Sequence, residues 1–247
     1  MNIKHYLDST YLKTAEQAGI SEAQNKKIVA DFILEAIKED FKVIMIRPMY
    51  VSLAKQMIVN VNAKLSIGTV ISFPEGSNST EEKLEEAMQA IKNGADDLDF
   101  VCNYEAFKNG ELAVVKKEIL ECTRLGLDNN KIVKWIIEVA ALNSNQIIQF
   151  SALIKNVIMA NFKDEFYKDV FVKSSTGFYK TLNNLPNGAT IESIVMMLEN
   201  ASPLSIKASG GVKTYQEAIA MIHLGVKRIG TSSAKAIAND EVITNNY

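Results

Sequence analysis

Short apolar segments alternate with longer amphipathic ones along the whole chain. Eight of the apolar segments have the length and composition of β-strands, and turn residues or helix-like stretches lie between them. The predicted strands span residues 5–10, 42–48, 65–73, 96–103, 132–139, 169–175, 204–210 and 227–233. This regular alternation predicts a sheet whose consecutive strands are connected by helices.

The segments between the predicted strands carry helix start and stop signals. Residues 21–24 (SEAQ), 79–82 (STEE) and 214–217 (TYQE) each fit a capping box, with a hydroxyl first and Glu or Gln three residues later. Gly94 and Gly225 stand where a helix end needs a left-handed residue. The helix predicted after the first strand has one apolar face, formed by Ile28, Val29, Phe32, Ile33, Ala36 and Ile37.

Eight alternating strand and helix units in 247 residues match a (β/α)8 TIM barrel in number and length. A doubly wound open sheet also alternates, but it normally has a glycine-rich turn after its first strand. Residues 10–17 (TYLKTAEQ) contain no glycine. No linker-like tract divides the chain, so we expect a single domain over residues 1–247, with a mobile tail at 240–247.

Composition and charge narrow the class of protein further. The net charge is −2, from 27 basic and 29 acidic residues, which offers no general attraction to nucleic acid or to an anionic membrane. No apolar run approaches the length of a membrane span. Cys102 and Cys122 form no CxxC pair, and His5 and His223 cannot make a histidine-rich metal site. We therefore expect a cytoplasmic protein with reduced thiols.

Charged residues interrupt several of the predicted strands, although parallel barrel strands are normally near-continuous apolar runs. The period of two places Lys134 and Glu138 on one face of their strand, and Asp97 and Asp99 on one face of theirs. The charged positions are Asp8, Asp97, Asp99, Lys134, Glu138, Lys173 and Lys207. Each could lie singly at a strand end and reach water, but together they favour a paired cluster inside the barrel.

Two or more lysines and a carboxylate in a dry pocket suit one kind of chemistry. A lysine beside another cation loses basicity, so more of it is a free nucleophilic amine at neutral pH. Such an amine can attack a carbonyl and form a Schiff base, which accepts electrons when a C–C bond breaks. A nearby carboxylate can move protons directly or through water. The residue types therefore indicate a class I aldolase.

The last two predicted strands are followed by candidate phosphate-binding loops. Residues 209–211 (SGG) follow the seventh strand, and residues 230–233 (GTSS) lie at the end of the eighth. Backbone N–H groups of such loops bind phosphate, and in barrels the usual phosphate site lies at these two positions. Simple turn glycines and a serine cap are the alternative interpretation.

With these segments in view, the chain resembles the deoxyribose-phosphate aldolase family over most of its length. The lysine-containing strand followed by STGF, with KASGG about 34 residues later, is the most specific part of the pattern. The matching segments are 7–12 (LDSTYL), 73–76 (FPEG), 85–101 (EEAMQAIKNGADDLDFV), 134–138 (KWIIE), 172–178 (VKSSTGF), 206–212 (IKASGGV) and 228–233 (RIGTSS).

The resemblance implies reversible cleavage of 2-deoxy-D-ribose 5-phosphate to D-glyceraldehyde 3-phosphate and acetaldehyde, with no metal or organic cofactor. It implies that Lys173 is the Schiff-base lysine, Lys207 the cation that lowers its pKa and Asp99 an acid/base partner acting through water. Asp8 and Lys134 would support the polar network. The substrate phosphate would lie against Gly177, Gly210, Gly211, Ser232 and Ser233.

The resemblance also bears on the C-terminus and on assembly. Some members of the family end in a tyrosine on a mobile tail, so Tyr247 is a candidate for moving the proton of the enamine. A frayed terminus is the alternative. We expect small sugar-phosphate and aldehyde substrates, with no nucleic-acid or membrane partner. A homodimer is a hypothesis that the sequence itself does not test.

Several positions depart from the family pattern without touching the lysine pair or Asp99. We expect these departures to alter the rim of the pocket and the substrate range, and to leave the class of enzyme unchanged. They are Met45, Glu75, Ser174 and the segments 138–142 and 161–169.

Two other functions remain open from the residues themselves. The chain could be a transaldolase or another sugar-phosphate aldolase, or a barrel without activity that binds or regulates. The inactive barrel predicts loss of the amine or its partners, yet Lys173, Lys207 and Asp99 are all present.

Overall fold

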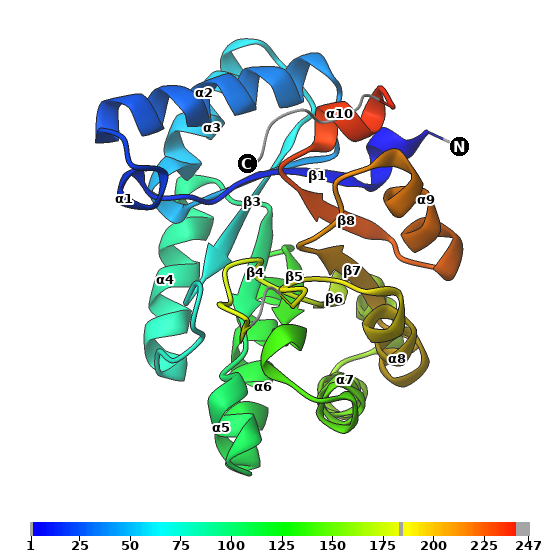
Figure 1. Ribbon diagram of the computed structural model, residues 1–247. Coiled ribbons are helices and arrows are strands. Elements are labelled where there is room, and N and C mark those ends of the chain that lie inside the picture. Colours follow the sequence, from blue (N-terminus) through cyan, green and yellow to red (C-terminus); the bar gives the residue numbers. More distant parts are fainter. Residues whose placement is uncertain (1, 183–184, 241–247) are drawn as a thin grey trace.

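The computed structural model describes residues 2–182 and 185–240, and over these residues the chain forms a closed barrel of eight parallel strands in sequence order. Helices surround the strands on the outside (Figure 1). The strands are β1 (Leu7–Tyr11), β2 (Val43–Ile46), β3 (Ser66–Ile71), β4 (Asp97–Val101), β5 (Ile132–Ile136), β6 (Val170–Lys173), β7 (Ser205–Ser209) and β8 (Arg228–Thr231). The prediction of a single-domain (β/α)8 TIM barrel is confirmed.

Ten α-helices and four short 3₁₀ segments complete the described part of the chain. The α-helices are α1 (Ala15–Ala18), α2 (Glu22–Lys38), α3 (Val51–Asn60), α4 (Thr80–Asn93), α5 (Tyr104–Lys108), α6 (Leu112–Asp128), α7 (Ser144–Asn161), α8 (Ile191–Ala201), α9 (Tyr215–Leu224) and α10 (Ala234–Ala238). The 3₁₀ segments are η1 (Ile3–Tyr6), η2 (Pro48–Tyr50), η3 (Val139–Ala141) and η4 (Asp164–Asp169).

The start and stop signals act as predicted. Ser21, Ser79 and Thr214 each form a complete capping box at the start of α2, α4 and α9. Gly94 and Gly225 end α4 and α9 with φ of 107° and 117°, in the left-handed region that glycine adopts without steric cost. Local hydrogen bonding therefore defines the ends of these helices before any tertiary packing does.

Most of the strands end earlier than their apolar patterns predict. The residues just past three of the strand ends have positive φ, namely Ser72 at 55°, Glu138 at 56° and Gly210 at 75°. After β4, Asn103 instead accepts the N–H of Ala106 and caps α5. A left-handed residue breaks the period-two alternation, so the predicted sharing of one strand face by Lys134 and Glu138 is wrong.

The barrel has two apolar regions, one on each side of its strands. In β2, Ile44 and Ile46 pack in the large cluster between strands and helices. Val43 and Met45, which alternate with them, belong to a small separate cluster with Leu12 and Val70. The interior is therefore only partly apolar, and the charged side chains fill much of the rest.

One of the segments that depart from the family pattern lies far from the C-terminal ends of the strands. Residues 161–169 form the end of α7 and the segment η4, which precedes β6. This segment is at the N-terminal end of the barrel strands, whereas barrel active sites lie at the C-terminal end. The expectation that it alters the rim of the pocket is therefore wrong.

A buried ion pair connects two outer helices to the end of β4. Lys83 of α4 is paired with Glu118 of α6, and both are at most 1% exposed. The Lys83 ammonium also donates to the carbonyl of Val101 at 2.9 Å, and Glu118 accepts the N–H of Asn103 at 2.8 Å. The pair therefore holds the backbone where β4 turns into α5.

We expect Glu118→Leu to lower the free energy of unfolding by about 3–5 kcal/mol, because it leaves the Lys83 ammonium buried without its counterion. The double variant Lys83→Met/Glu118→Leu should be clearly more stable than the single one, since it removes both charges. Urea unfolding measures the difference, with Glu81→Leu at an exposed ion pair as the control. Equal destabilisation in the single and double variants would contradict this account.

No helix among the described residues is long and apolar enough to cross a membrane. Cys102 and Cys122 are buried free cysteines, in agreement with the expectation of reduced thiols. Burial raises the pKa of the Cys122 thiol to about 12 and that of Cys102 well above its ordinary value. Neither cysteine is therefore a reactive thiolate at neutral pH.

Candidate active site

Six strands bring charged side chains together in the interior of the barrel. Strand register places Asp99 beside Lys134, and it places Lys207 between Lys173 and Arg228. None of the charged side chains in this cluster is more than 5% exposed. The members are Asp8 (β1), Asp97 and Asp99 (β4), Lys134 (β5), Lys173 (β6), Lys207 (β7) and Arg228 (β8).

Asp99 is the centre of this cluster. Its Oδ2 accepts from the Nζ of Lys173 and from the Nζ of Lys207, both at 2.8 Å. Its Oδ1 accepts from the Nζ of Lys134, also at 2.8 Å. The structure therefore brings together the two lysines and the carboxylate that the sequence singled out, on one acidic group.

The other contacts close the cluster into a ring. Lys134 also binds Asp97, with Nζ to Oδ2 at 2.6 Å, and Lys207 also binds Asp8, with Nζ to Oδ2 at 2.7 Å. Arg228 joins these two carboxylates, at 2.6 Å from Asp8 Oδ1 and 3.2 Å from Asp97 Oδ2. Each carboxylate thus has at least two cationic partners.

Sequence reasoning missed Arg228 and gave Asp97 no role. Arg228 is the first residue of β8, and it is separated by one position from Gly230, which belongs to the predicted phosphate loop. A charged residue inside that strand was the available signal, the same signal that identified Lys173 and Lys207. Asp97 was already placed on the face of Asp99 by the period of two.

The ring is not balanced in charge when every group is ionised. It contains four cations and three carboxylates, so one proton is in excess. Burial raises the pKa of Asp99, but the ammonium groups of Lys134, Lys173 and Lys207 outweigh it and hold this pKa well below its usual range. Burial likewise opposes Arg228, Lys207 and Lys134 at Asp8, whose pKa is also lowered. The excess proton is therefore most easily lost from a lysine.

Lys173 is a lysine of the ring whose pKa is lowered. Burial is the largest cause and lowers its pKa to about 8, with Lys207 and Lys134 acting in the same direction against Asp99. Burial also acts on Lys134, but Asp97 and Asp99 reverse its effect and raise that pKa above the ordinary value. Among the causes that lower the Lys173 pKa, burial is therefore the first and Lys207 the second.

A cavity of about 240 Å³ lies at the C-terminal ends of β6, β7 and β8. Four of the five residues predicted to hold a phosphate line it, namely Gly177, Gly210, Gly211 and Ser232. Ser233 is outside this lining, and its N–H donates to the hydroxyl of Thr231. Lys213, which sequence reasoning missed, lines the cavity two residues after Gly211 and adds a cation to it.

Close backbone contact holds the loops around this cavity. A Cβ on Gly188 would lie 2.3 Å from the carbonyl carbon and oxygen of Gly210, a distance that no side chain tolerates. Ala189 donates its N–H toward the carbonyls of Ser209 and Gly210, and Asn187 donates to the carbonyl of Gly177. The connection from β6 to α8 is thereby fastened to the loop after β7.

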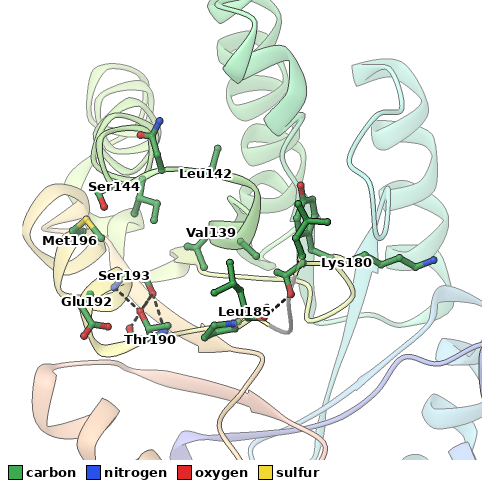
Figure 2. Close-up of a pocket in the computed structure, with 17 residues that line it drawn as sticks. Val139, Leu142, Ser144, Lys180, Leu185, Thr190, Glu192, Ser193 and Met196 are labelled. Atoms are coloured by element: carbon green, nitrogen blue, oxygen red, sulfur yellow. Dashed lines mark hydrogen bonds between the residues drawn. The ribbon is translucent and has the colours of Figure 1, made fainter.

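A larger cavity, of about 610 Å³, lies on the other side of the β6–α8 connection (Figure 2). Its lining comes from η3, from the first turns of α7 and α8, and from residues 179–182, 185, 186 and 188. Figure 2 shows Lys180 and Leu185 on that connection, opposite Ser144 of α7 and Met196 of α8. None of the predicted site residues that the structure describes lines this cavity. The volume of a cavity therefore does not identify the candidate active site in this protein.

The C-terminal tyrosine and possible metal ligands are the remaining candidates for the site. Tyr247 lies outside the described residues. Among the described residues, no group of three or more His, Cys, Asp and Glu side chains could hold a metal ion. The carboxylates of the buried ring are bound to ammonium and guanidinium groups instead.

Curated relatives show the family of the chain. No protein-family model matches the chain. A deoxyribose-phosphate aldolase from Thermococcus gammatolerans is 36% identical over 238 residues, which cover 96% of this chain and 95% of that protein. One from Streptococcus pneumoniae is 33% identical over 248 residues, covering all of both chains.

Solved structures show the same similarity. The structure described as "QR15, an Aldolase" superposes with a TM-score of 0.80 at 30% identity, covering 97% of this chain and 95% of that one. A tetrameric deoxyribose phosphate aldolase from Aeropyrum pernix gives a TM-score of 0.75 at 24% identity, covering 96% of this chain and 89% of that one. At this identity the similarity supports the fold alone.

Proposed function

Because the chain belongs to the deoxyribose-phosphate aldolase family, we propose that it cleaves 2-deoxy-D-ribose 5-phosphate reversibly through a Schiff base on Lys173. The products are D-glyceraldehyde 3-phosphate and acetaldehyde. The single observation that carries this proposal is the contact of Lys173 Nζ with Asp99 Oδ2, which Lys207 shares. It supplies a partly unprotonated amine beside an ionised acid and a second cation.

The reaction begins at the amine of Lys173. The free amine attacks the aldehyde carbon of the open-chain sugar, and loss of water gives the protonated Schiff base. A pKa of about 8 leaves about a tenth of the amine unprotonated at pH 7, against roughly one part in 3,000 for a lysine at 10.5. Burial and the Lys207 ammonium thus supply the nucleophile.

Bond cleavage follows at the iminium. A base removes the proton of the C3 hydroxyl, the C2–C3 bond breaks, and its electron pair moves toward the iminium nitrogen to form an enamine. Asp99 is the group we assign to this proton transfer, through water, because its low pKa keeps it ionised. Glyceraldehyde 3-phosphate leaves, the enamine is protonated at C2, and hydrolysis releases acetaldehyde and the free lysine.

The remaining residues position the substrate and the charges. Asp8 holds the Lys207 ammonium, and Lys134 holds the other oxygen of Asp99. We assign the substrate phosphate to the 240 Å³ cavity, where Lys213 adds charge to the backbone N–H groups of the glycine loops. The predicted residues of this site are Gly177, Gly210, Gly211, Ser232 and Ser233.

Other parts of the proposal remain to be tested. They are a cytoplasmic location, the absence of a cofactor other than the covalent Schiff base, a homodimeric assembly and proton transfer to the enamine by Tyr247. Deletion of Tyr247 should slow proton exchange at the methyl group of acetaldehyde and leave imine formation unchanged. An unchanged exchange rate would remove this role.

Borohydride reduction in the presence of deoxyribose 5-phosphate or acetaldehyde tests the proposed function directly. We expect mass spectrometry to find one reduced adduct, on Lys173, and product analysis to find glyceraldehyde 3-phosphate and acetaldehyde. An adduct on another lysine, or none, would disprove the mechanism. Products of a different length would favour another sugar-phosphate aldolase or a transaldolase.

A further inference from the structure

Glu138 is a buried acid that the proposed reaction does not use. It lies two residues after the end of β5 and is 1% exposed. Its φ of 56° and ψ of 70° lie in the left-handed region, which is costly for a residue with a side chain. The backbone on either side bonds to the end of β6 and the residue after it, since Ile137 donates to the carbonyl of Lys173 at 3.0 Å and Val139 to that of Ser174 at 2.9 Å. Glu138 is therefore held firmly beside the Schiff-base strand.

The two oxygens of the Glu138 carboxylate have different surroundings. Oε2 accepts the N–H of Thr176 at 3.1 Å and also the hydroxyl of Thr176. Oε1 is buried and has no hydrogen-bond partner among the described residues. A strained backbone and an unsatisfied oxygen both cost stability, and such costs are characteristic of functional positions.

Thr176 connects Glu138 to the substrate cavity. Thr176 lines the 240 Å³ cavity together with Gly177 and Gly210. A hydroxyl has one proton to donate and two lone pairs to accept with. The proton is directed at Glu138, and one lone pair accepts the N–H of Phe178 at 3.0 Å. Thr176 can then only accept a further hydrogen bond, from a donor in the cavity.

We propose that Glu138 is a positioning residue that, through Thr176, makes the cavity select acceptor aldehydes with a hydroxyl next to the carbonyl. This inference rests on the proposed function, and it adds the source of its acceptor specificity. A hydroxyl of the acceptor donates to the free lone pair of Thr176, whereas a CH₂ group leaves that buried lone pair unpaired. A site built to bind a hydroxyl rejects an analogue that lacks it for this reason.

The ionisation of Glu138 makes this selectivity depend on pH. Burial raises the pKa of Glu138 to about 7, while the bonds from Thr176 and the charge of Lys173 oppose it. Tyr104 of α5 is the other titratable group beside it, and burial followed by Glu138 raises the pKa of that phenol to about 12. Below pH 7 the protonated acid can donate to Thr176, which fills the second lone pair and frees the hydroxyl proton, so Thr176 changes from an acceptor to a donor. Selectivity should therefore rise with pH through about 7.

The test compares two acceptors that differ by one hydroxyl. With acetaldehyde as donor, kcat/KM is measured for glyceraldehyde 3-phosphate and for 3-oxopropyl phosphate between pH 5.5 and 8.5. Because Lys173 titrates in both reactions, the ratio of the two kcat/KM values is independent of its titration. We expect the native protein to prefer the hydroxylated acceptor about 10- to 100-fold, with the preference falling below pH 7.

The variants separate positioning from a structural role. Thr176→Val and Glu138→Leu should each reduce the ratio of the two kcat/KM values to near one. The double variant should show the same ratio as the single variants. Glu138→Gln keeps an acceptor for Thr176, so it should retain the preference and lose its pH dependence. A native preference in Glu138→Leu, or an unchanged pH profile in Glu138→Gln, would overturn the proposal. If Glu138→Leu does not fold, Thr176→Val and Glu138→Gln decide the question.

Borohydride trapping with acetaldehyde distinguishes this proposal from the function on which it rests. Acetaldehyde has neither hydroxyl nor phosphate, so all five proteins should form the Lys173 adduct at similar rates. Normal trapping with unchanged acceptor preference in the variants would overturn the role of Glu138 alone. No adduct in the native protein would overturn the proposed function, and this inference with it.

Discussion

Lys173→Met is expected to abolish turnover and to raise the stability of the fold. Removal of the nucleophile from a covalent mechanism typically lowers kcat by about 10⁴- to 10⁶-fold. Steady-state assay of deoxyribose 5-phosphate cleavage measures the loss, and borohydride trapping should give no adduct. Lys116→Ala, at an exposed lysine, is the matched control and should keep native activity. Residual turnover within 100-fold of the native protein would exclude Lys173 as the nucleophile.

The expected gain in stability follows from the pKa of the same amine. In the unfolded chain Lys173 titrates near 10.5, and in the folded protein near 8, so the unfolded state binds more protons between these values. Burial of this lysine therefore costs the folded protein stability, fully below about pH 8 and not at all above 10.5. Methionine fills similar volume without a charge and should recover on the order of 2 to 3 kcal/mol at pH 7.

Unfolding in urea at pH 7 and at pH 10.5 measures this effect. The advantage of Lys173→Met over the native protein should be largest at pH 7 and should shrink at the higher pH. A variant that is less stable than the native protein at pH 7 would show that Lys173 contributes more through Asp99 than its burial costs. The comparison therefore tests whether stability is lost here to keep a reactive amine.

The charged strand positions and the loop glycines were predictable because each is a local signal. A lysine within an apolar segment can be recognised from the sequence without knowledge of the fold, as for Lys173 and Lys207. The period of two then assigns Asp97 and Asp99 to one face without knowledge of the neighbouring strands. Three capping boxes likewise depend only on residues three positions apart.

The features that were missed depend on contacts between distant segments. Arg228 acquires its place only when β8 closes the barrel against β1, because its carboxylate partners Asp8 and Asp97 lie 220 and 131 positions away. Gly188 is needed only because the loop after β7 approaches it. At Glu138 the apolar pattern predicted a continued strand, but the residue is in the left-handed conformation. Hydrogen bonds from its two neighbours to Lys173, the last residue of β6, and to Ser174 after it fix the backbone there.

Lys207→Leu should lower activity at pH 7 by about 100-fold and shift the pH profile toward higher pH. Lys207 shares Asp99 Oδ2 with Lys173, and its charge is one of the causes that lower the Lys173 pKa. Leucine keeps the site dry but removes that charge, and it leaves Asp99 to hold the proton on Lys173 more strongly. Each rise of one in this pKa lowers the free amine at pH 7 about tenfold.

The shape of the pH profile separates this explanation from simple damage to the site. If the pKa of Lys173 rises, the rate of the variant should increase with pH well beyond the point where the native rate levels off near 8, and trapping by acetaldehyde should recover in parallel. Glu81→Leu at the surface is the control for an unrelated loss of charge. A native rate at pH 7 would remove the role of Lys207, and a low rate that does not recover at high pH would assign it to substrate binding instead.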